Sequence, residues 1–351
     1  MIGLTPERIT EELQQFHAKL TQGAKTLRDL GDIEAGVSPR DPIYQQDKLA
    51  LYHYQPRVAQ PHSIPVLIVY ALVNRPYMMD LQEDRSMIRG LLDAGLDVYL
   101  IDWGYPDAND RHLTLADYIH RYIADCVDHL RDRHGLEAIN LLGVCQGGAL
   151  SLCFAALYPQ KIRNLITMVT PVDFHTSDNL LTHLIRHVDV DLLVDTLGNL
   201  PGQMLNFAFV SLSPFRLAGQ KYVDVVDILD DAQVLKNFLR MEKWIYDSPD
   251  QAGEAFRQFA KDFFQQNKLI KGEVIIGDQR VDLHNVTMPI LNVYASQDHL
   301  VPPAASKALA EVCGSSDYSE LSFRGGHIGL YVSARSQREV PPAVAAWLLE
   351  H

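Results

Sequence analysis

The feature that most constrains the fold is a series of short apolar runs, each followed by a segment with helical spacing. The runs cover residues 66–71, 96–102, 139–144, 165–170 and 290–295, and helical candidates between them cover 83–92, 115–133 and 147–157. Strands that are apolar throughout and alternate with helices are typical of a mostly parallel sheet with helices on both faces. The sequence therefore predicts an α/β fold.

The alternation of strands and helices stops in the middle of the chain. Residues 174–283 carry apolar and aromatic residues at helical spacing, as in "NFLRMEKWIYDSP" and "EAFRQFAKDFFQQN". We interpret them as a mainly helical insertion, or cap, in an α/β core formed by residues 41–173 and 284–351. Residues 1–40 begin with an amphipathic helical pattern. This N-terminal arm either folds over the core or docks a second subunit.

Composition and charge exclude several classes of function. The formal net charge is −13 and no basic stripe is visible, so nucleic acid is not an expected partner. The four cysteines show no CxxC pairing, which argues against a zinc site or a disulfide framework. We find no signal peptide and no apolar run long enough to span a membrane, and therefore expect a cytoplasmic protein without a bound metal.

The most informative motif surrounds Cys145. Residues 143–147 read Gly-Val-Cys-Gln-Gly and lie between an expected strand and an expected helix. This is the G-x-nucleophile-x-G form of a nucleophile elbow, in which glycines allow a strained, closely packed turn. The motif predicts Cys145 as the nucleophile and the amide of Gln146 as one half of an oxyanion hole. Val73, in the loop after residues 66–71, is our candidate for the second amide.

A less specific interpretation of the motif stays open. A tight turn with a buried cysteine would also produce this pattern in a glycine-containing chain. The other cysteines, Cys126, Cys153 and Cys313, lie in surroundings that indicate simple packing.

An elbow nucleophile needs an acid and a histidine later in the chain, in that order. Asp298 follows the expected strand 290–295, and His327 follows another expected strand at 318–323. Both positions are loops at the carboxyl ends of strands, where open α/β sheets carry their chemistry. We therefore predict a Cys145–Asp298–His327 triad. The alternatives are a helix cap for Asp298 and an exposed loop position for His327.

Four further residues are weaker candidates for a role. His299 flanks the expected site and is a candidate for contact with a phosphate or for orienting the substrate. Asp102 ends an expected strand. It either supports or positions the site, or it makes an ordinary turn contact. His183 and His187 are spaced i, i+4 and could hold a metal, but no acidic third ligand accompanies them, so we favour a solvated face.

A cysteine at the elbow has a chemical consequence. A serine would accept an acyl group as an oxygen ester, which is lower in energy than a thioester. A cysteine exchanges one thioester for another and keeps the acyl group activated for attack by an alcohol. Such a site must exclude water, which the long insertion could do as a lid.

Taken together, these motifs resemble the catalytic subunit of polyhydroxyalkanoate synthases, particularly the short class III type that works with a second subunit. The resemblance covers nearly the whole chain and includes "GVSPRDPIYQQDKLALYHY", "PVLIVYALVNRPYMMDLQEDRS", "NLLGVCQGG", "QDHLVPP" and "GGHIGLYVS". Class IV enzymes have a comparable length. The resemblance implies an α/β-hydrolase fold with a helical cap over Cys145.

The resemblance also implies an activity and partners. The activity is polymerisation of (R)-3-hydroxyacyl-CoA, chiefly 3-hydroxybutyryl-CoA, through a thioester on Cys145, with His327 as the base and Asp298 assisting. Coenzyme A is then a product, and no cofactor is expected. The implied partners are a second, non-catalytic subunit, another copy of the chain and the surface of a polyester granule. Two other functions stay open: a thiol-dependent hydrolase, such as a thioesterase or a dienelactone-hydrolase-like enzyme, and a non-catalytic granule-associated scaffold.

Overall fold

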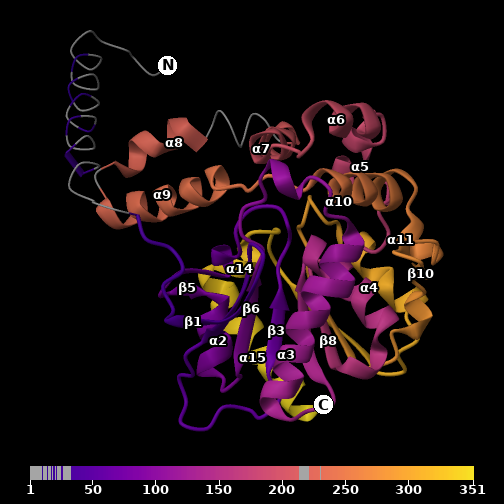
Figure 1. Cartoon of the computed structure of the whole chain (residues 1–351). Coiled ribbons are helices and arrows are strands. Elements are labelled where there is room, and N and C mark those ends of the chain that lie inside the picture. The colour runs from indigo at the N-terminus through magenta and orange to yellow at the C-terminus, as the bar shows by residue number, and fades with distance from the viewer. Residues whose placement is uncertain are drawn as a thin grey trace.

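An eight-stranded sheet forms the centre of the part of the chain that the structure describes (Figure 1). The computed structural model describes residues 33–212, 221–229 and 231–351, together with Thr10, Gln14, His17, Lys19, Thr21, Lys25 and Thr26. Most of the predicted N-terminal arm, residues 1–40, therefore lies outside the described residues. The strands are β1 (Arg40–Gln46), β2 (Leu49–Tyr54), β3 (Val66–Val69), β6 (Val98–Asp102), β7 (Ile139–Val144), β8 (Ile162–Met168), β11 (Ile290–Ala295) and β12 (Tyr318–Phe323).

The predicted mostly parallel sheet is confirmed. The strand order is β1-β2-β6-β3-β7-β8-β11-β12. Strand β2 pairs antiparallel with β1 and β6, and the remaining neighbours pair in parallel. The carboxyl ends of β3, β7, β11 and β12 therefore meet at one edge of the sheet, where ligands bind in folds of this type.

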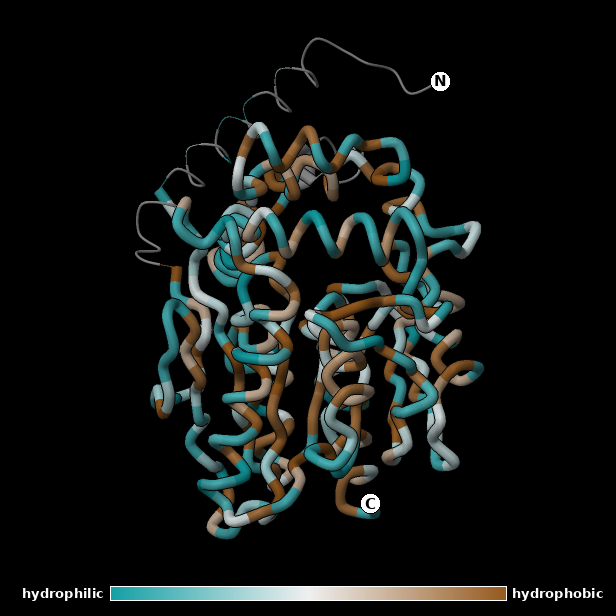
Figure 2. The backbone as a smooth tube through the Cα atoms, turned by 45° about the vertical axis from the view of Figure 1, so that its right-hand side comes forward, coloured by the Kyte–Doolittle hydropathy of each residue, from teal (hydrophilic) through white to brown (hydrophobic). Residues whose placement is uncertain are grey.

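Successive residues of a strand point to opposite sides of the sheet. Both faces of this sheet therefore carry apolar side chains, and helices cover both faces. Leu67 and Val69 of β3 belong to one hydrophobic cluster, together with residues of η3 (Asp117–Ile123), α3 (Ala124–His134) and α4 (Gln146–Leu157). Val66 and Ile68 belong to a second cluster with α2 (Met87–Asp93), α14 (Gly329–Val332) and α15 (Ala334–Glu350). Figure 2 shows hydrophobic stretches along the strands between these layers.

Short elements connect the layers of the core. They are η1 (Pro76–Met79), β4 (Asp80–Gln82), β5 (Arg85–Ser86), η2 (Ala108–Asp110), η4 (Pro159–Lys161), η7 (Leu283–Asn285), α12 (Pro303–Lys307) and α13 (Leu309–Val312). Within the described ranges, no helix is both long and apolar enough to cross a membrane.

The chain between β8 and β11 is mainly helical in its described part, and its helices lie across one end of the sheet (Figure 1). The predicted boundaries at residues 174 and 283 stay a prediction. The elements are α5 (Leu180–Ile185), α6 (Val190–Leu197), α7 (Gly202–Ser211), α8 (Lys221–Ile228), α9 (Ala232–Tyr246), α10 (Gly253–Gln258), η6 (Phe259–Gln265), α11 (Lys268–Lys271), β9 (Ile275–Ile276) and β10 (Gln279–Arg280).

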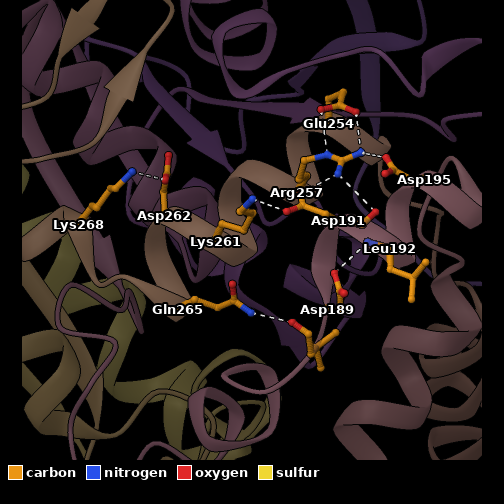
Figure 3. Close-up of polar contacts among 11 residues, drawn as sticks. Asp189, Asp191, Leu192, Asp195, Glu254, Arg257, Lys261, Asp262, Gln265 and Lys268 are labelled. Carbon is orange, nitrogen blue, oxygen red and sulfur yellow. Dashed lines mark hydrogen bonds and ion pairs between the residues drawn. The ribbon is translucent and has the colours of Figure 1, made fainter.

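Ion pairs join α6 to α10 and η6 within this segment (Figure 3). Arg257 donates hydrogen bonds to Asp191 at 2.7 Å and to Asp195 at 2.6 Å. Lys261 donates to the second oxygen of Asp191 at 2.6 Å. Hydrogen bonds from Lys261 and Arg257 hold the pKa of Asp191 below its ordinary value. Because one arginine contacts two carboxylates one helical turn apart, the rotation of α6 on α10 is fixed.

Helix α4 lies unusually close to the sheet, and Gly148 makes this approach possible. A Cβ atom on Gly148 would lie 1.8 Å from Thr170 Oγ1, a short side chain that cannot move aside. We expect Gly148→Ala to destabilise the fold by at least about 1–3 kcal/mol, the usual cost of overpacking. Gly329→Ala is the control because a Cβ there meets nothing within 4 Å. Thermal unfolding that gives equal melting temperatures for the two variants would contradict the expected close contact.

Candidate active site

Cys145 occupies a strained position between β7 and α4, as the elbow motif predicted. Its φ and ψ angles are 54° and −121°, in a region that residues with side chains rarely adopt. The amide of Cys145 donates to the carbonyl of Met168 at 2.9 Å, and its own carbonyl accepts from Gly148 at 3.0 Å. These main-chain bonds hold the residue in the strained geometry.

The glycines of the motif are required by close contacts. A Cβ on Gly147 would lie 2.3 Å from the carbonyl oxygen of Val69 and 2.4 Å from that of Tyr70. A Cβ on Gly143 would lie 2.6 Å from the Cα of Gly148. Because the contacts of Gly147 are to main-chain atoms, a side chain could be accommodated only by moving a strand.

Asp298 and His327 come from different loops and are in direct contact. His327 Nδ1 lies 2.7 Å from Asp298 Oδ2, and both side chains are buried. The other oxygen of Asp298 accepts from the amides of Leu300 and Val301 at 2.9 and 3.0 Å. Asp298 therefore also holds the following turn, but it is not the helix cap considered as an alternative, because the N-cap of α12 is Pro302. The exposed position considered for His327 is wrong.

The surroundings of His327 bring Cys145 into the same group. Burial alone lowers the pKa of His327, but the charges of Asp298 and Cys145, together with hydrogen bonds to both, raise it to about 10. The three predicted side chains therefore lie in one group, in which Asp298 contacts His327 directly. Their catalytic roles stay a prediction at this point.

The two predicted oxyanion residues lie in neighbouring segments. Gln146 is the first residue of α4, and amides in the first turn of a helix have no intrahelical acceptor. The side chain of Gln146 accepts from the amide of Leu72 at 3.1 Å and so ties the loop that carries Val73 to the elbow. Sequence reasoning used only the main chain of Gln146 and missed this side-chain contact.

Of the remaining candidates, Asp102 has a defined structural role. It is buried and accepts from Arg75 Nη2 at 2.8 Å and from the amide of Gly104 at 3.0 Å. Asp102 therefore makes an ordinary turn contact and also holds Arg75, which is close to Val73 in sequence.

The other candidate histidines are exposed, unlike the buried His327. His299 follows Asp298 and is exposed, and its predicted contact with the substrate is untested. His183 and His187 are exposed on and after α5. Within the described ranges, no group of three or more His, Cys, Asp or Glu side chains could hold a metal ion.

The loop after β3 is also held from the inserted segment, a set of contacts that sequence reasoning missed. Trp244 Nε1 of α9 donates to the carbonyl of Arg75 at 2.8 Å. Asp247 accepts from the hydroxyl of Tyr77 in η1 at 3.0 Å and also from that of Tyr105, in the segment after β6, at 2.7 Å. These contacts join residues more than a hundred positions apart, and no local pattern in the sequence indicates them.

The comparisons with known proteins agree with the fold. The family described as "alpha/beta hydrolase fold" matches residues 64–334. A monoacylglycerol lipase from Paleococcus ferrophilus is similar in structure, with 18% identity, a TM-score of 0.54 and coverage of 88% of this chain and 100% of that chain. A thermophilic esterase from Thermogutta terrifontis gives 17% identity, a TM-score of 0.50 and coverage of 89% and 99%. The protein is therefore an α/β hydrolase by fold.

Relatives in sequence define the family more narrowly. The family described as "Poly-beta-hydroxybutyrate polymerase (PhaC) N-terminus" matches residues 7–91. The poly(3-hydroxyalkanoate) polymerase subunit PhaC of Allochromatium vinosum is 59% identical over 99% of both chains. The subunit of the same name from Thiocystis violacea is 57% identical over 99% of both chains. This chain belongs to the poly(3-hydroxyalkanoate) polymerase family, in its PhaC subunit branch, which confirms the predicted resemblance.

The raised pKa of His327 predicts a pH dependence of stability. Folding raises this pKa from 6.5 to about 10, so the folded state binds the proton more tightly between these values. The stabilisation is fully present below pH 6.5 and is lost as the pH rises through about 10. Relative to His327→Gln, the wild-type melting temperature should therefore fall across this window. Asp298→Asn, which removes one of the charges responsible, should weaken the effect, and parallel curves for all three proteins would contradict it.

The contact between Gln146 and Leu72 predicts a separate effect on turnover. Gln146→Met keeps the length of the side chain but removes the acceptor, so the loop with Val73 is held less firmly. We expect kcat to fall by about tenfold, less than the roughly 10²-fold loss on removing an oxyanion donor itself. Steady-state kinetics give the measurement. Gln160→Met, at an exposed site in η4, is the matched control, and equal kcat values for both variants would contradict the role of the contact.

Proposed function

We propose that this chain polymerises (R)-3-hydroxyacyl-CoA, chiefly 3-hydroxybutyryl-CoA, into polyester and releases coenzyme A through a thioester on Cys145. The observation that carries the proposal is the buried contact between His327 and Asp298, with Cys145 close enough to shift the pKa of His327 and placed at a strained strand-to-helix turn. Membership of the polymerase family supports the same activity. The enzyme would be an acyltransferase with a Cys-Asp-His triad.

The first step is acylation of Cys145. His327 would accept the proton of the Cys145 thiol, which makes the sulfur the attacking group, and the raised pKa of His327 supports this role as a base. The thiolate forms a bond to the acyl carbon, the bond from that carbon to the sulfur of coenzyme A breaks, and the proton on His327 passes to the departing thiolate. The amides of Gln146 and Val73 would stabilise the oxyanion formed between these events.

The second step transfers the acyl group to an alcohol. The 3-hydroxyl of another hydroxyacyl unit attacks the thioester carbon, its proton goes to His327, and the bond from carbon to Cys145 sulfur breaks. The product is an ester one unit longer, and the thiolate is regenerated. The contact between Asp298 and His327 Nδ1 supports a role for Asp298 through the histidine, by orienting the ring and balancing its charge.

Water must be kept from the thioester for polymer to form. The burial of His327 and Asp298 supports a closed site, and residues 174–283 would form the cap that closes it. Contacts from Trp244 and Asp247 to the loop after β3 support this assignment because they seat the insertion beside the predicted oxyanion residues.

The proposal extends to partners and location. The relatives in the PhaC branch are called subunits, which supports a second, non-catalytic subunit of the class III type. We further propose a homodimer that works in the cytoplasm at the surface of a polyester granule. Large exposed apolar side chains on α6 and α7, among them Leu192, Met204 and Phe207, support contact with an apolar surface or a partner.

Incubation of the purified chain with (R)-3-hydroxybutyryl-CoA, with and without a candidate second subunit, tests the proposal. We expect release of coenzyme A together with insoluble polyester. Cys145→Ala should lower the rate of release by at least about 10³-fold because it removes the nucleophile. Cys313→Ala is the matched control, since it removes a half-buried thiol outside the triad, and its rate should stay within about twofold of the wild type.

Other outcomes would favour the alternative functions. Release of coenzyme A with free 3-hydroxybutyrate and no polymer would indicate a thioesterase or another thiol-dependent hydrolase. Activity of the assembled complex that survives Cys145→Ala would indicate a scaffold.

A further inference from the structure

Tyr331 has a buried hydroxyl beside the triad that the chemistry above does not use. The residue lies in α14, four positions after His327, and the two rings meet edge to face with centroids 5.8 Å apart. The side chain is 1% exposed. Among the described residues, the hydroxyl oxygen has no hydrogen-bond partner.

A buried hydroxyl without a partner is uncommon because it loses its bonds to water and gains nothing in return. Among the described side chains, Tyr331 is the only tyrosine with a fully buried, unpaired hydroxyl. The hydroxyl of Tyr99 donates to Asp97 at 3.2 Å, and the hydroxyl of Tyr122 donates to Asp47 at 2.7 Å. Because the Tyr331 hydroxyl is unpaired and its ring contacts His327, it is available to hydrogen-bond a ligand bound beside that histidine.

The surroundings indicate what this hydroxyl can do. Burial raises the pKa of Tyr331 well above its ordinary value, and nearby Tyr70, Cys145 and Asp298 raise it further. The hydroxyl therefore keeps its proton and acts as a hydrogen-bond donor. Because the ring of Tyr331 contacts the ring of His327, this donor lies beside the group of residues where the acyl group on Cys145 would be bound.

We propose that the Tyr331 hydroxyl donates a hydrogen bond to the 3-oxygen of the hydroxyacyl group bound at Cys145, an inference that rests on the proposed function. The acyl unit has two polar regions, and the amides of Gln146 and Val73 are assigned to its carbonyl oxygen. The 3-oxygen is the remaining acceptor. No proton is transferred, because Tyr331 stays neutral throughout.

This contact would make Tyr331 a specificity-determining residue. A site that hydrogen-bonds a hydroxyl of its substrate rejects an analogue that lacks the hydroxyl, because the buried donor is then left unpaired. The chain should therefore discriminate 3-hydroxybutyryl-CoA from butyryl-CoA in the acylation step, before any polymer forms.

The test compares single-turnover acylation by the two thioesters, measured as release of coenzyme A, in wild type and Tyr331→Phe. We expect the wild type to prefer 3-hydroxybutyryl-CoA, and Tyr331→Phe to reduce this preference by at least about tenfold through slower reaction of the hydroxylated substrate. The melting temperature of Tyr331→Phe should equal or exceed that of the wild type, since the variant removes an unpaired buried group.

Tyr54→Phe is the matched control, because Tyr54 is buried in the same hydrophobic cluster as Tyr331. The hydroxyl of Tyr54 already has a partner, since it accepts a hydrogen bond from Arg40. It should leave the preference between the two thioesters unchanged. An unchanged preference in Tyr331→Phe, or equal slowing of both substrates, would overturn the inference while leaving the polymerase proposal intact. Absence of acylation of the wild type by either thioester would instead overturn the proposed function, and this inference with it.

Discussion

The close approach of α4 to the sheet is the constraint on which the candidate site depends. It forces Cys145 into a positive φ angle and holds it there through main-chain bonds to Met168 and Gly148. It also excludes side chains at Gly147 and Gly148. A looser contact between strand and helix would relax the turn, and the thiol would no longer be presented at the sheet edge toward His327. The role assigned to Cys145 thus depends both on the thiol and on the packing of α4 against the sheet, which sets the position of the thiol.

Electrostatics and packing support each other around this turn. The ion pair of His327 with Asp298 is buried, where an unpaired charge would be strongly unfavourable, so each residue stabilises the charge of the other. On the opposite side, the loop after β3 is held from the core by Asp102 and from the inserted helices by Trp244. The insertion is therefore part of the architecture of the site, because a shift of α9 would move the segment that carries Val73.

Local patterns predicted the elements that are apolar on both faces. Strands β7, β11 and β12 begin and end where the pattern placed them, whereas β8 begins at Ile162, three residues earlier than expected. The exposed Arg163 interrupts the apolar run at that end and hides the start of the strand. The β1–β2 hairpin was missed altogether. Strand β1 contains many polar and partly exposed residues, and the tight turn before β2 places Asp47 at a φ of 52°, without a glycine to signal it.

By itself, the sequence determined the parallel sheet and the family, and it predicted the elbow at Cys145 and the roles of Asp298 and His327, because each of these rests on short-range spacing or on local motifs. Only the tertiary structure decided that Asp298 both holds a turn and contacts His327, that the side chain of Gln146 holds Leu72, and that the hydroxyl of Tyr331 is left without a partner. Such relations join segments distant in the chain. They depend on distances and burial that arise only when the sheet, its helices and the inserted segment pack together.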